Sequence, residues 1–363
     1  MRILVAGAGP AGLYFSYLAK RRHPGWRIRV VEQNRADSTF GFGVVFSDRA
    51  LEFLREDDAA TCDLITPQME AWTDLKVVHR GTPVVIDGIG FAAIGRLKLL
   101  RLLQRQLASV GVVPEYEKQI AEEKDYDLIV AADGVNSVVR GWHDFGTRVS
   151  HLTNKFAWYG TTRAFDTLTQ TFVANEHGTF NAHHYRHSRE MSTFVVECDA
   201  GTWERAGFAS MNEAQTLAYC EQVFAQALGG HRLVSNRSVW RNFPNLRNQK
   251  YFLENIVLIG DALRSAHFSI GSGTRLAMED AIALAKALGE HSAVEKSLIA
   301  FEAARRPIVQ KLLAAADASG AWYERFPEHM KLAPREFAWS YIQRSGRIDP
   351  GRLRKISPRF VDG

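Results

Sequence analysis

The chain opens with two apolar runs separated by a helical pattern. Residues 2–6 form a largely apolar segment that is typical of a buried strand, and residues 28–32 form a second one. Between them, residues 11–20 carry apolar side chains at helical spacing. A strand, a helix and a strand in this order predict a βαβ unit and therefore a parallel sheet.

Further along the chain the pattern changes twice. Helical spacing of apolar residues predicts helices over residues 96–110, 212–228, 275–289 and 294–325. Short apolar runs predict two more buried strands over residues 127–132 and 255–259. Between about residues 153 and 198, aromatic and β-branched residues alternate with polar ones, which is typical of a half-solvated antiparallel sheet. We therefore expect a nucleotide-type α/β domain that is interrupted by a β-sheet domain.

Composition narrows the class of protein. The chain has 363 residues, a net charge of +5 and a pI of about 9.1. The basic residues are scattered, so they would help an anionic ligand to approach but indicate no nucleic-acid-binding surface. No apolar stretch is long enough to span a membrane, and the N-terminal run lacks the features of a signal peptide. Three widely spaced cysteines, Cys62, Cys198 and Cys220, predict a reduced cytoplasmic protein without disulfides.

The first candidate for chemistry is Gly7-Ala-Gly-Pro-Ala-Gly12, which follows the first predicted strand. In a GxGxxG motif the first glycine permits a tight turn, the second lets the backbone approach a pyrophosphate, and the third lets helix and strand pack closely. The helix N-terminus offers N–H groups to phosphates, and an acid ends the second strand, where it would hold a ribose. The residues expected at a dinucleotide are Gly7, Gly9, Pro10, Ala11, Gly12 and Glu32. The alternative is a glycine-rich turn in an ordinary α/β protein.

Two later carboxylates also follow predicted strands. Asp133 begins the segment Asp133-Gly-Val-Asn-Ser-Val-Val-Arg140, and Asp261 ends the strand at 255–259. Ligands of open parallel sheets bind at the carboxyl ends of strands. Beyond the second carboxylate, a glycine turn exposes backbone N–H groups at the start of a helix; its residues are Gly271, Ser272, Gly273 and Thr274. A plain β-turn at Asp133 and a cap of the following turn at Asp261 are the alternatives.

Together, these motifs in this order resemble those of the single-component FAD-dependent aromatic hydroxylases related to para-hydroxybenzoate hydroxylase. The resemblance covers the chain from Arg2 to about Arg325. It implies non-covalently bound FAD, with Glu32 at the adenosine ribose and the first glycine turn at the pyrophosphate. It also implies that Asp261 contacts the ribityl chain or pyrophosphate and that residues 271–274 approach the isoalloxazine. Arg96 and Asp133 match further cofactor-binding positions of the family.

The resemblance also implies a reaction. NADH or NADPH would reduce the flavin, and O₂ would then form a C4a-hydroperoxide that hydroxylates an aromatic ring. The protein would supply orientation, proton placement and a dry cavity, which agrees with a sequence that shows no convincing catalytic triad. A flavoprotein oxidase, dehydrogenase or halogenase and a non-catalytic nucleotide-binding protein are the alternatives, although the WxWxIP stretch of the halogenases is not present.

Several shorter stretches resemble one subgroup of these hydroxylases. They are Gly41-Phe-Gly-Val-Val-Phe-Ser47, Trp158-Tyr-Gly-Thr161, Thr193-Phe-Val-Val-Glu197 and His267-Phe-Ser-Ile-Gly-Ser-Gly273. The subgroup includes the flavin domains of anthraniloyl-CoA monooxygenases and salicylyl-CoA 5-hydroxylases, and the violacein-pathway tryptophan hydroxylase is a neighbour. It implies an aromatic acyl-CoA substrate, with a free aromatic or indole compound as the alternative. The chain departs from the wider family at Arg264, to which the resemblance assigns no role.

Pattern and resemblance together predict an α/β fold in which a Rossmann-type FAD-binding domain is interrupted by an antiparallel β-sheet substrate domain. The FAD-binding domain would comprise residues 1–75, 96–150 and 251–325, the last part including a long helix. The substrate domain would comprise residues 76–95 and 151–250. Residues 326–363 would form a C-terminal extension. We expect a monomer or a homodimer.

A further set of residues is expected to line the substrate pocket. His267 could face the substrate ring and polarise a substituent, or it could be a structural histidine. His183 and His184 are adjacent on a predicted strand, so only one of them can face the site. No carboxylate or cysteine stands at ligand spacing from them, and we expect no metal site. The pocket residues would be Phe46, Trp158, His183 and Phe268, and positions in the core or the sheet are the alternative.

Overall fold

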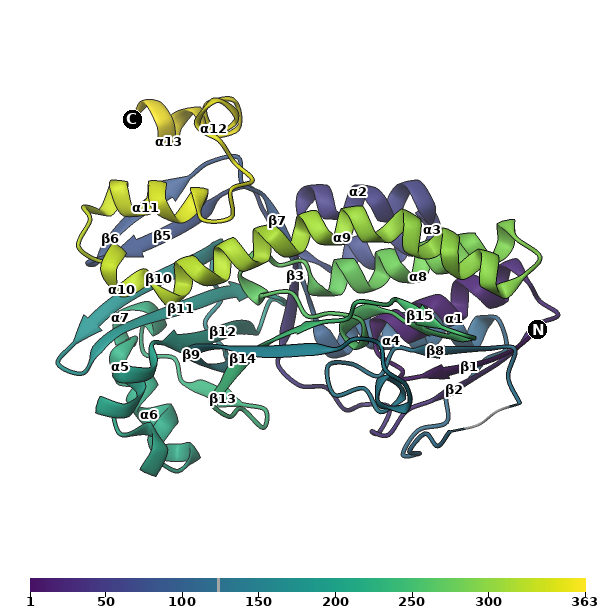
Figure 1. Ribbon diagram of the computed structural model, residues 1–363. Coiled ribbons are helices and arrows are strands. Elements are labelled where there is room, and N and C mark those ends of the chain that lie inside the picture. Colours follow the sequence, from purple (N-terminus) through teal and green to yellow (C-terminus); the bar gives the residue numbers. More distant parts are fainter. Residues whose placement is uncertain (123–124) are drawn as a thin grey trace.

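The structure is a computed structural model that describes residues 1–122 and 125–363. Its first sheet has five strands in the order β15-β16-β8-β1-β2 (Figure 1). Their bounds are Phe252–Leu253, Ile256–Leu258, Leu128–Ala131, Arg2–Ala6 and Arg27–Val31. All neighbours are parallel except β15 and β16. Strands β1 and β2 pair in parallel on either side of a helix in the chain, Pro10–Arg22, which confirms the predicted βαβ opening. The apolar strands β1 and β8 are buried along almost their whole length.

Three helices pack around this sheet and a fourth extends beyond it. Helix α1 (Pro10–Arg22) contacts both α4 (Arg96–Ser109) and α8 (Gly273–Glu290). Helix α9 (Val294–Glu324) packs on α8 and continues along the second sheet (Figure 1). All four helices confirm predictions from apolar spacing. In α4, for example, the apolar side chains at helical spacing are the buried ones.

The second sheet forms the β domain. Its strand order is β13-β9-β12-β11-β10-β5-β6, and β14 also pairs with β9. The bounds, in that order and ending with β14, are Leu233–Ser235, Arg148–Thr161, Ser192–Cys198, Gly178–Arg186, Leu168–Asn175, Leu75–His79, Thr82–Ile86 and Arg241–Arg247. Every pair is antiparallel except β5 with β10. The antiparallel texture predicted for residues 153–198 is therefore confirmed.

The two faces of this sheet have different surroundings. On one face, side chains such as Tyr159 and Phe194 pack beneath helices α5 (Ala200–Arg205), α6 (Glu213–Val223) and α7 (Ala225–Leu228). The opposite face carries Phe172, whose ring contacts Trp322 of α9. In this face Trp158, Val195 and His183 stand in one row across neighbouring strands. The sheet therefore presents one row of side chains toward the first domain.

A small third sheet connects the two domains. Its order is β3-β7-β4, with bounds Gly43–Ser47, Phe91–Gly95 and Glu70–Trp72. Helices α2 (Asp48–Asp57) and α3 (Ala59–Ile65) follow β3. Single 3₁₀ turns lie at Thr66–Gln68, Val139–Trp142, Phe208–Ser210, Gly260–Ala262 and Phe268–Ile270. The segment 76–95 was predicted to belong to the substrate domain. Its strand β6 lies in the large sheet, whereas β7 lies in the small one. The domain boundaries therefore stay a proposal.

The C-terminal segment packs on the edge of the large sheet. Its helices are α10 (Phe326–His329), α11 (Pro334–Gln343), α12 (Pro350–Ile356) and α13 (Pro358–Asp362), and α11 and α13 contact β6. The Asp87 carboxylate, beyond the end of β6, accepts hydrogen bonds from the backbone N–H of Phe360 at 2.8 Å and of Arg359 at 3.3 Å. Gly88 must be glycine here, because a Cβ would lie 1.8 Å from the carbonyl oxygen of Ile356.

Among the described residues, no helix is both long and apolar enough to cross a membrane.

Candidate active site

The first glycine turn has the geometry that close approach of a phosphate requires. Gly7 has a φ of +96°, and a Cβ at Gly12 would lie 2.0 Å from the Gly7 carbonyl oxygen. Nothing lies within 4 Å of the Cβ position at Gly9, which is the N-cap of α1. The backbone N–H groups at the start of α1, from Ala11 onward, are therefore approachable from this open side. Pro10 occupies the first position of the helix, where no N–H is needed.

The Glu32 carboxylate lies against this turn. One oxygen accepts a hydrogen bond from Ala8 N–H at 2.9 Å, and the other accepts from Asn34 N–H at 2.8 Å. Glu32 is half-buried at the carboxyl end of β2. Its backbone contacts fix the carboxylate beside the phosphate-binding turn, at the position where the motif requires a ribose ligand.

Asp261 and Arg96 come together at the centre of the site. Asp261 follows β16 and Arg96 begins α4, and their charges interact. Burial raises the pKa of the Asp261 carboxyl, and the charges of Arg96 and Arg264 offset part of that rise. Surrounding protein atoms desolvate the Asp261 carboxyl, but the residue keeps an exposed surface. Its carboxylate is therefore accessible to a polyhydroxyl chain.

Asp133 caps its own turn, and one of its carboxylate oxygens is left without a partner in the described structure. One carboxylate oxygen accepts hydrogen bonds from Val138 N–H at 2.8 Å and Val139 N–H at 3.2 Å, which is the turn-capping role. The other oxygen is buried without a hydrogen-bond partner in the described structure, and burial raises the pKa of the carboxyl. The guanidinium of Arg140 donates to the carbonyl oxygen of Ala262 at 2.9 Å. This bond ties the Asp133 motif to the Asp261 turn.

The second glycine turn leads directly into α8. Gly271 has a φ of +60°, and its Cβ position lies 3.3 Å from a methyl group of Val45 on β3. Ser272 occupies the N-cap position of α8 without a side-chain capping bond, and nothing lies within 4 Å of the Cβ position at Gly273. The N–H groups of Gly273 and Thr274 therefore point from an accessible helix N-terminus, where a partial positive charge favours an electron-rich ligand edge.

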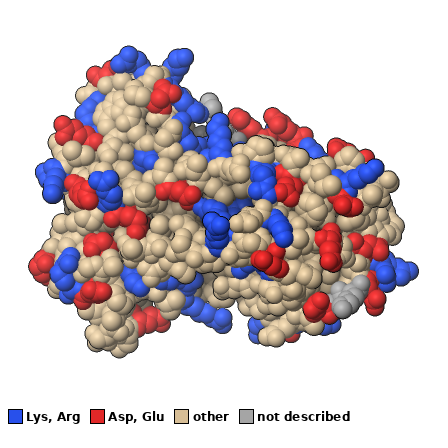
Figure 2. All heavy atoms as spheres, viewed as in Figure 1, with Lys and Arg blue, Asp and Glu red and all other residues tan. Residues whose placement is uncertain are grey.

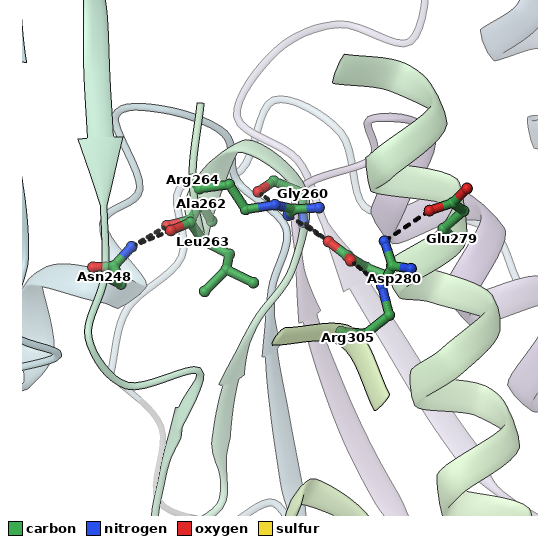
Figure 3. Close-up of polar contacts among 8 residues, drawn as sticks. All are labelled: Asn248, Gly260, Ala262, Leu263, Arg264, Glu279, Asp280 and Arg305. Carbon is green, nitrogen blue, oxygen red and sulfur yellow. Dashed lines mark hydrogen bonds and ion pairs between the residues drawn. The ribbon is translucent and has the colours of Figure 1, made fainter. Parts of the chain in front are cut away.

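Arg264, which had no role in the resemblance, belongs to a buried ionic network (Figure 3). Its guanidinium pairs with Asp280 and donates to the Gly260 carbonyl oxygen at 2.9 Å. Asp280 also accepts from Gly260 N–H at 3.0 Å and from the Arg305 Nε at 2.9 Å, and Arg305 lies 2.9 Å from Glu279. The network thereby holds both backbone groups of Gly260, whose φ is +61°. It fixes the turn that presents Asp261.

These residues form a set that fits a flavin dinucleotide. The first turn, Glu32, Asp133 and Asp261 all follow strands of the parallel sheet, so they lie along one edge. Helix N-termini would hold the phosphates and the flavin's pyrimidine edge, and carboxylates would hold the ribose and ribityl hydroxyls. The unpartnered oxygen of Asp133 and the open carboxylate of Asp261 are acceptors suited to these hydroxyls.

A cavity of about 260 Å³ adjoins the second glycine turn. It lies between β3, β5, β7 and β10 on one side and the C-terminal helices on the other. Val45, Ile270 and Gly271 form the end next to the proposed flavin site. The remaining lining residues are Ser47, Leu75, Gly88, Ile89, Gly90, Phe91, Leu168, His183, Ser269, Arg275, Tyr341, Ile342, Arg344, Ser345, Arg347, Ile348, Arg352 and Ile356. No motif in the sequence predicted that C-terminal residues would line this cavity.

The two candidate histidines, His183 and His267, interact electrostatically, but only His183 is among the residues that line the cavity. His183 lines the cavity, whereas His184 stacks on Phe194 on the other face, so the predicted alternation is confirmed. His267 is buried, and its Nδ1 lies 2.7 Å from the hydroxyl of Ser269. Burial, reinforced by the charge of Arg344, lowers the pKa of both His183 and His267 to about 3. Both imidazoles are therefore neutral near pH 7.

The three candidate aromatic residues do not lie together. Trp158 and Phe268 are half-buried and pack edge to face with ring centroids 5.9 Å apart. Phe46 is 2% exposed and belongs to the core of the first domain. Strand alternation explains this placement, because it turns the neighbours of Phe46, Val45 and Ser47, toward the cavity instead.

Glu197 is a buried acid that sequence patterns did not single out. It stands beside Phe156 in the sheet and accepts a hydrogen bond from Asn154 at 2.8 Å. Burial raises its pKa to about 8, so the side chain is neutral at pH 7. Glu197 ends the stretch Thr193–Glu197 that resembles the hydroxylase subgroup, but only the surrounding packing identifies it as a buried acid.

Comparison with known proteins agrees with this geometry. Residues 103–316 match the family described as FAD binding domain. The whole chain is 40% identical to a salicyloyl-CoA 5-hydroxylase from Streptomyces sp., of which the alignment covers 73%. It is 37% identical to a protodeoxyviolaceinate monooxygenase from Chromobacterium violaceum, covering 96% of each chain. It is also 37% identical to a 3-hydroxy-4-methyl-anthranilyl-(aryl-carrier protein) 5-monooxygenase from Streptosporangium sibiricum, covering 90% of each.

The fold has a solved counterpart. The structure of 2-methyl-3-hydroxypyridine-5-carboxylic acid oxygenase has a TM-score of 0.72 to this chain, at 18% identity, and the match covers 98% of this chain and 95% of that one. The site defines a flavin-dependent monooxygenase. The chain belongs to the family of FAD-dependent aromatic hydroxylases. Its cofactor is FAD, and NADH or NADPH supplies the electrons.

Proposed function

We propose that the protein hydroxylates the aromatic ring of an aryl thioester, of the anthraniloyl-CoA or salicyloyl-CoA type. The observation that carries the proposal is the cavity, whose apolar inner end adjoins Gly271 and whose outer part is lined by arginines. An aryl thioester has the matching shape, with an apolar ring at one end and an anionic carrier at the other. Two of the relatives are named for reactions of aryl thioesters, one on CoA and one on a carrier protein.

The roles of the chain's own residues follow from their positions. FAD, when bound, activates O₂ so that one oxygen atom can be transferred to an electron-rich ring. We assign Glu32, Asp261 and the two glycine turns to FAD binding. Neutral His183, which lines the cavity, would donate or accept a hydrogen bond at the ring substituent, and His267, oriented by Ser269, would lie behind the lining. The apolar wall formed by residues such as Leu75 and Leu168 would exclude water from the reacting ring.

The proposal is tested by oxidation of NADH and NADPH with a panel of free aromatics and their CoA thioesters. Product is scored by mass. We expect a gain of one oxygen on an aryl-CoA, while the matching free acid is inert. Oxidation of the nicotinamide with peroxide as the only product from every thioester would refute the substrate assignment.

A second candidate substrate is a free aromatic or indole compound. The observation that favours it is the 37% identity to protodeoxyviolaceinate monooxygenase over nearly the whole chain. Turnover of an indole or a free acid in the same panel, with the thioesters inert, would support this candidate. Cytoplasmic location and a monomeric or homodimeric state are further proposals, which cell fractionation and light scattering would check.

A further inference from the structure

We infer that Arg275, Arg347 and Arg352 form a binding site for phosphate groups on the pantetheine arm of the substrate thioester. The inference rests on the proposed function and adds the part of the substrate that the aromatic ring does not explain. The ligand of this site would be a phosphorylated pantetheine. Both CoA and the arm of a carrier protein contain this group.

The lining of the cavity is strongly biased in charge. Among its described lining residues are four arginines and one histidine, and none is an aspartate or glutamate. Arg347 and Arg352 are exposed, whereas Leu75 and Leu168 are buried. Figure 2 shows basic side chains beside the hollow between the C-terminal helices and the rest of the molecule. The cavity therefore runs from an apolar interior to a cationic mouth.

The arginines at the mouth differ in how far the protein itself neutralises them. Arg275 pairs with Glu279 at 2.7 Å. Arg352 donates to the backbone oxygen of Arg347 at 3.2 Å and has no acidic partner among the described side chains. Arg347 has no acidic partner within 4 Å among the side chains that the structure describes. Partial desolvation beside the cavity and the charges of Arg275 and Arg352 lower the pKa of Arg347, although the residue as a whole is exposed. The cluster thus retains uncompensated positive charge that an anion would relieve.

Arg344 has a different position and is not assigned to phosphate. Its guanidinium donates to the carbonyl oxygens of Ser269 and Tyr341, both at 2.8 Å, and lies 3.9 Å from the centre of the Tyr341 ring. It therefore joins the C-terminal helices to the loop that carries His267. Guanidinium groups that keep free N–H donors, as those of Arg347 and Arg352 do, suit the bidentate recognition of phosphate.

The cavity is large enough for the aromatic ring of the substrate but not for the whole thioester. At about 260 Å³ the cavity is smaller than the range of about 300–1,000 Å³ that drug-sized ligands occupy. It has room for an aromatic acyl group, and the phosphorylated end of the arm must remain outside. The mouth, where the three arginines gather, is the place that this end would reach.

The C-terminal segment holds these arginines in place. Asp349 caps α12 by accepting from Arg352 N–H at 2.8 Å, and Asp87 accepts from the N-terminus of α13. The segment that carries Arg347 and Arg352 is thus fastened at both ends, at Arg344 and at Asp87. An anchored pair of arginines can bind an anion without a large ordering cost.

The test measures binding and does not depend on turnover. Benzoyl-CoA, benzoyl-4′-phosphopantetheine and benzoyl-pantetheine are titrated calorimetrically into the FAD-loaded protein. We expect affinity to rise from the compound without phosphate to those with phosphate. In the double variant Arg347→Gln/Arg352→Gln the affinity for benzoyl-CoA should fall about tenfold or more, while that for benzoyl-pantetheine stays the same. Arg354→Gln, an exposed arginine of the same helix, is the matched control and should behave like the wild type.

The outcomes separate the two proposals. A gain that is complete with the first phosphate indicates a carrier-protein arm, and a gain that needs CoA indicates the nucleotide phosphates; both support the site. Equal binding of the three compounds, no binding, or an equal loss for all three in the double variant would overturn it. If binding depends on phosphate but no thioester is hydroxylated, the proposed function fails and the phosphate site stands.

Discussion

At the residue scale, the dinucleotide-binding turn requires glycine because there is no space for a Cβ atom. The Cβ position of Gly12 lies 2.0 Å from the backbone oxygen of Gly7, and backbone cannot move aside as a flexible side chain can. Any side chain at this position must push α1 away from β1. The turn that would hold the FAD pyrophosphate is then distorted.

We predict that Gly12→Ala abolishes FAD binding. The purified variant should be colourless, and its flavin absorbance should not recover when FAD is added. Gly25→Ala is the matched control, because nothing lies within 4 Å of its Cβ position. A yellow Gly12→Ala protein with full FAD content would contradict the assignment of this turn.

The buried histidines give the folded state a pH dependence. The pKa of His183 is lowered to about 3, whereas an unfolded histidine titrates near pH 6.5. Below about pH 6.5 the unfolded chain therefore binds a proton that the folded chain does not. The free energy of unfolding is undiminished above that pH and falls as the pH drops toward the folded pKa, by about 1.4 kcal/mol per pH unit for each such histidine.

We predict that His183→Gln lessens this acid sensitivity. Urea unfolding of the FAD-loaded protein should show a slope smaller than in the wild type by about 0.7 kcal/mol per pH unit at about pH 6.5, rising to about 1.4 kcal/mol per pH unit near pH 5. His151→Gln, at an exposed position of β9, should leave the slope unchanged. Identical slopes for His183→Gln and the wild type would show that His183 is not held neutral by burial.

At the element scale, α8 and α9 hold the Asp261 turn through charge. Asp280 of α8 pairs with Arg264 beyond the turn and with Arg305 of α9, and all three side chains are at most 5% exposed. A buried ion pair is weak evidence for net stability, but removal of one partner leaves an uncompensated charge. Asp280 here is shared by two arginines.

We predict that Asp280→Asn destabilises the fold by about 3–5 kcal/mol and weakens FAD binding. Denaturant unfolding and FAD titration would measure both. Glu302→Gln removes the acid of an i,i+4 pair with Arg306 on the same helix, at the molecular surface, and should cost about 0–1 kcal/mol. A loss for Asp280→Asn no larger than that of the control would show that the network does not hold the turn.

The C-terminal helices depend on one carboxylate. Burial opposes ionisation of Asp87, but the N–H groups of Phe360 and Arg359 outweigh it and keep its pKa below the ordinary value. We predict that Asp87→Ala loosens the segment from residue 350 onward. Faster amide hydrogen exchange there, and weaker binding of the thioester arm, are the expected results. Asp362→Ala, at the exposed end of α13, should change neither.

At the scale of the whole molecule, the sequence predicted what local patterns encode. Strand and helix periodicity predicted β1, α1, β8, α4 and the long helix α9, since each buries a regular apolar face. The first glycine turn and the strand-end carboxylates were predicted because each follows a strand of one parallel sheet, and the second glycine turn because it precedes a helix. Strand alternation correctly required that only one of His183 and His184 face the site.

The features that could not be predicted are those that depend on long-range packing. Arg264 had no role until the fold brought α8 and α9 beside it. Phe46 was expected in the pocket, but its strand turns Val45 toward the cavity instead. Arg347 and Arg352 lie about seventy residues beyond Arg275 in the chain. These basic residues are scattered in the sequence and form one cluster at the cavity mouth only in the fold.

The proposed function requires that one oxygen atom from O₂ enters the ring of an aryl thioester. The most direct test is a single reaction of salicyloyl-CoA or anthraniloyl-CoA with the FAD-loaded protein and NAD(P)H under ¹⁸O-labelled O₂. Mass spectrometry of the acyl group should show one labelled oxygen on the ring and an intact thioester. Unlabelled hydroxylated product, or labelled peroxide with unchanged thioester, would contradict the account.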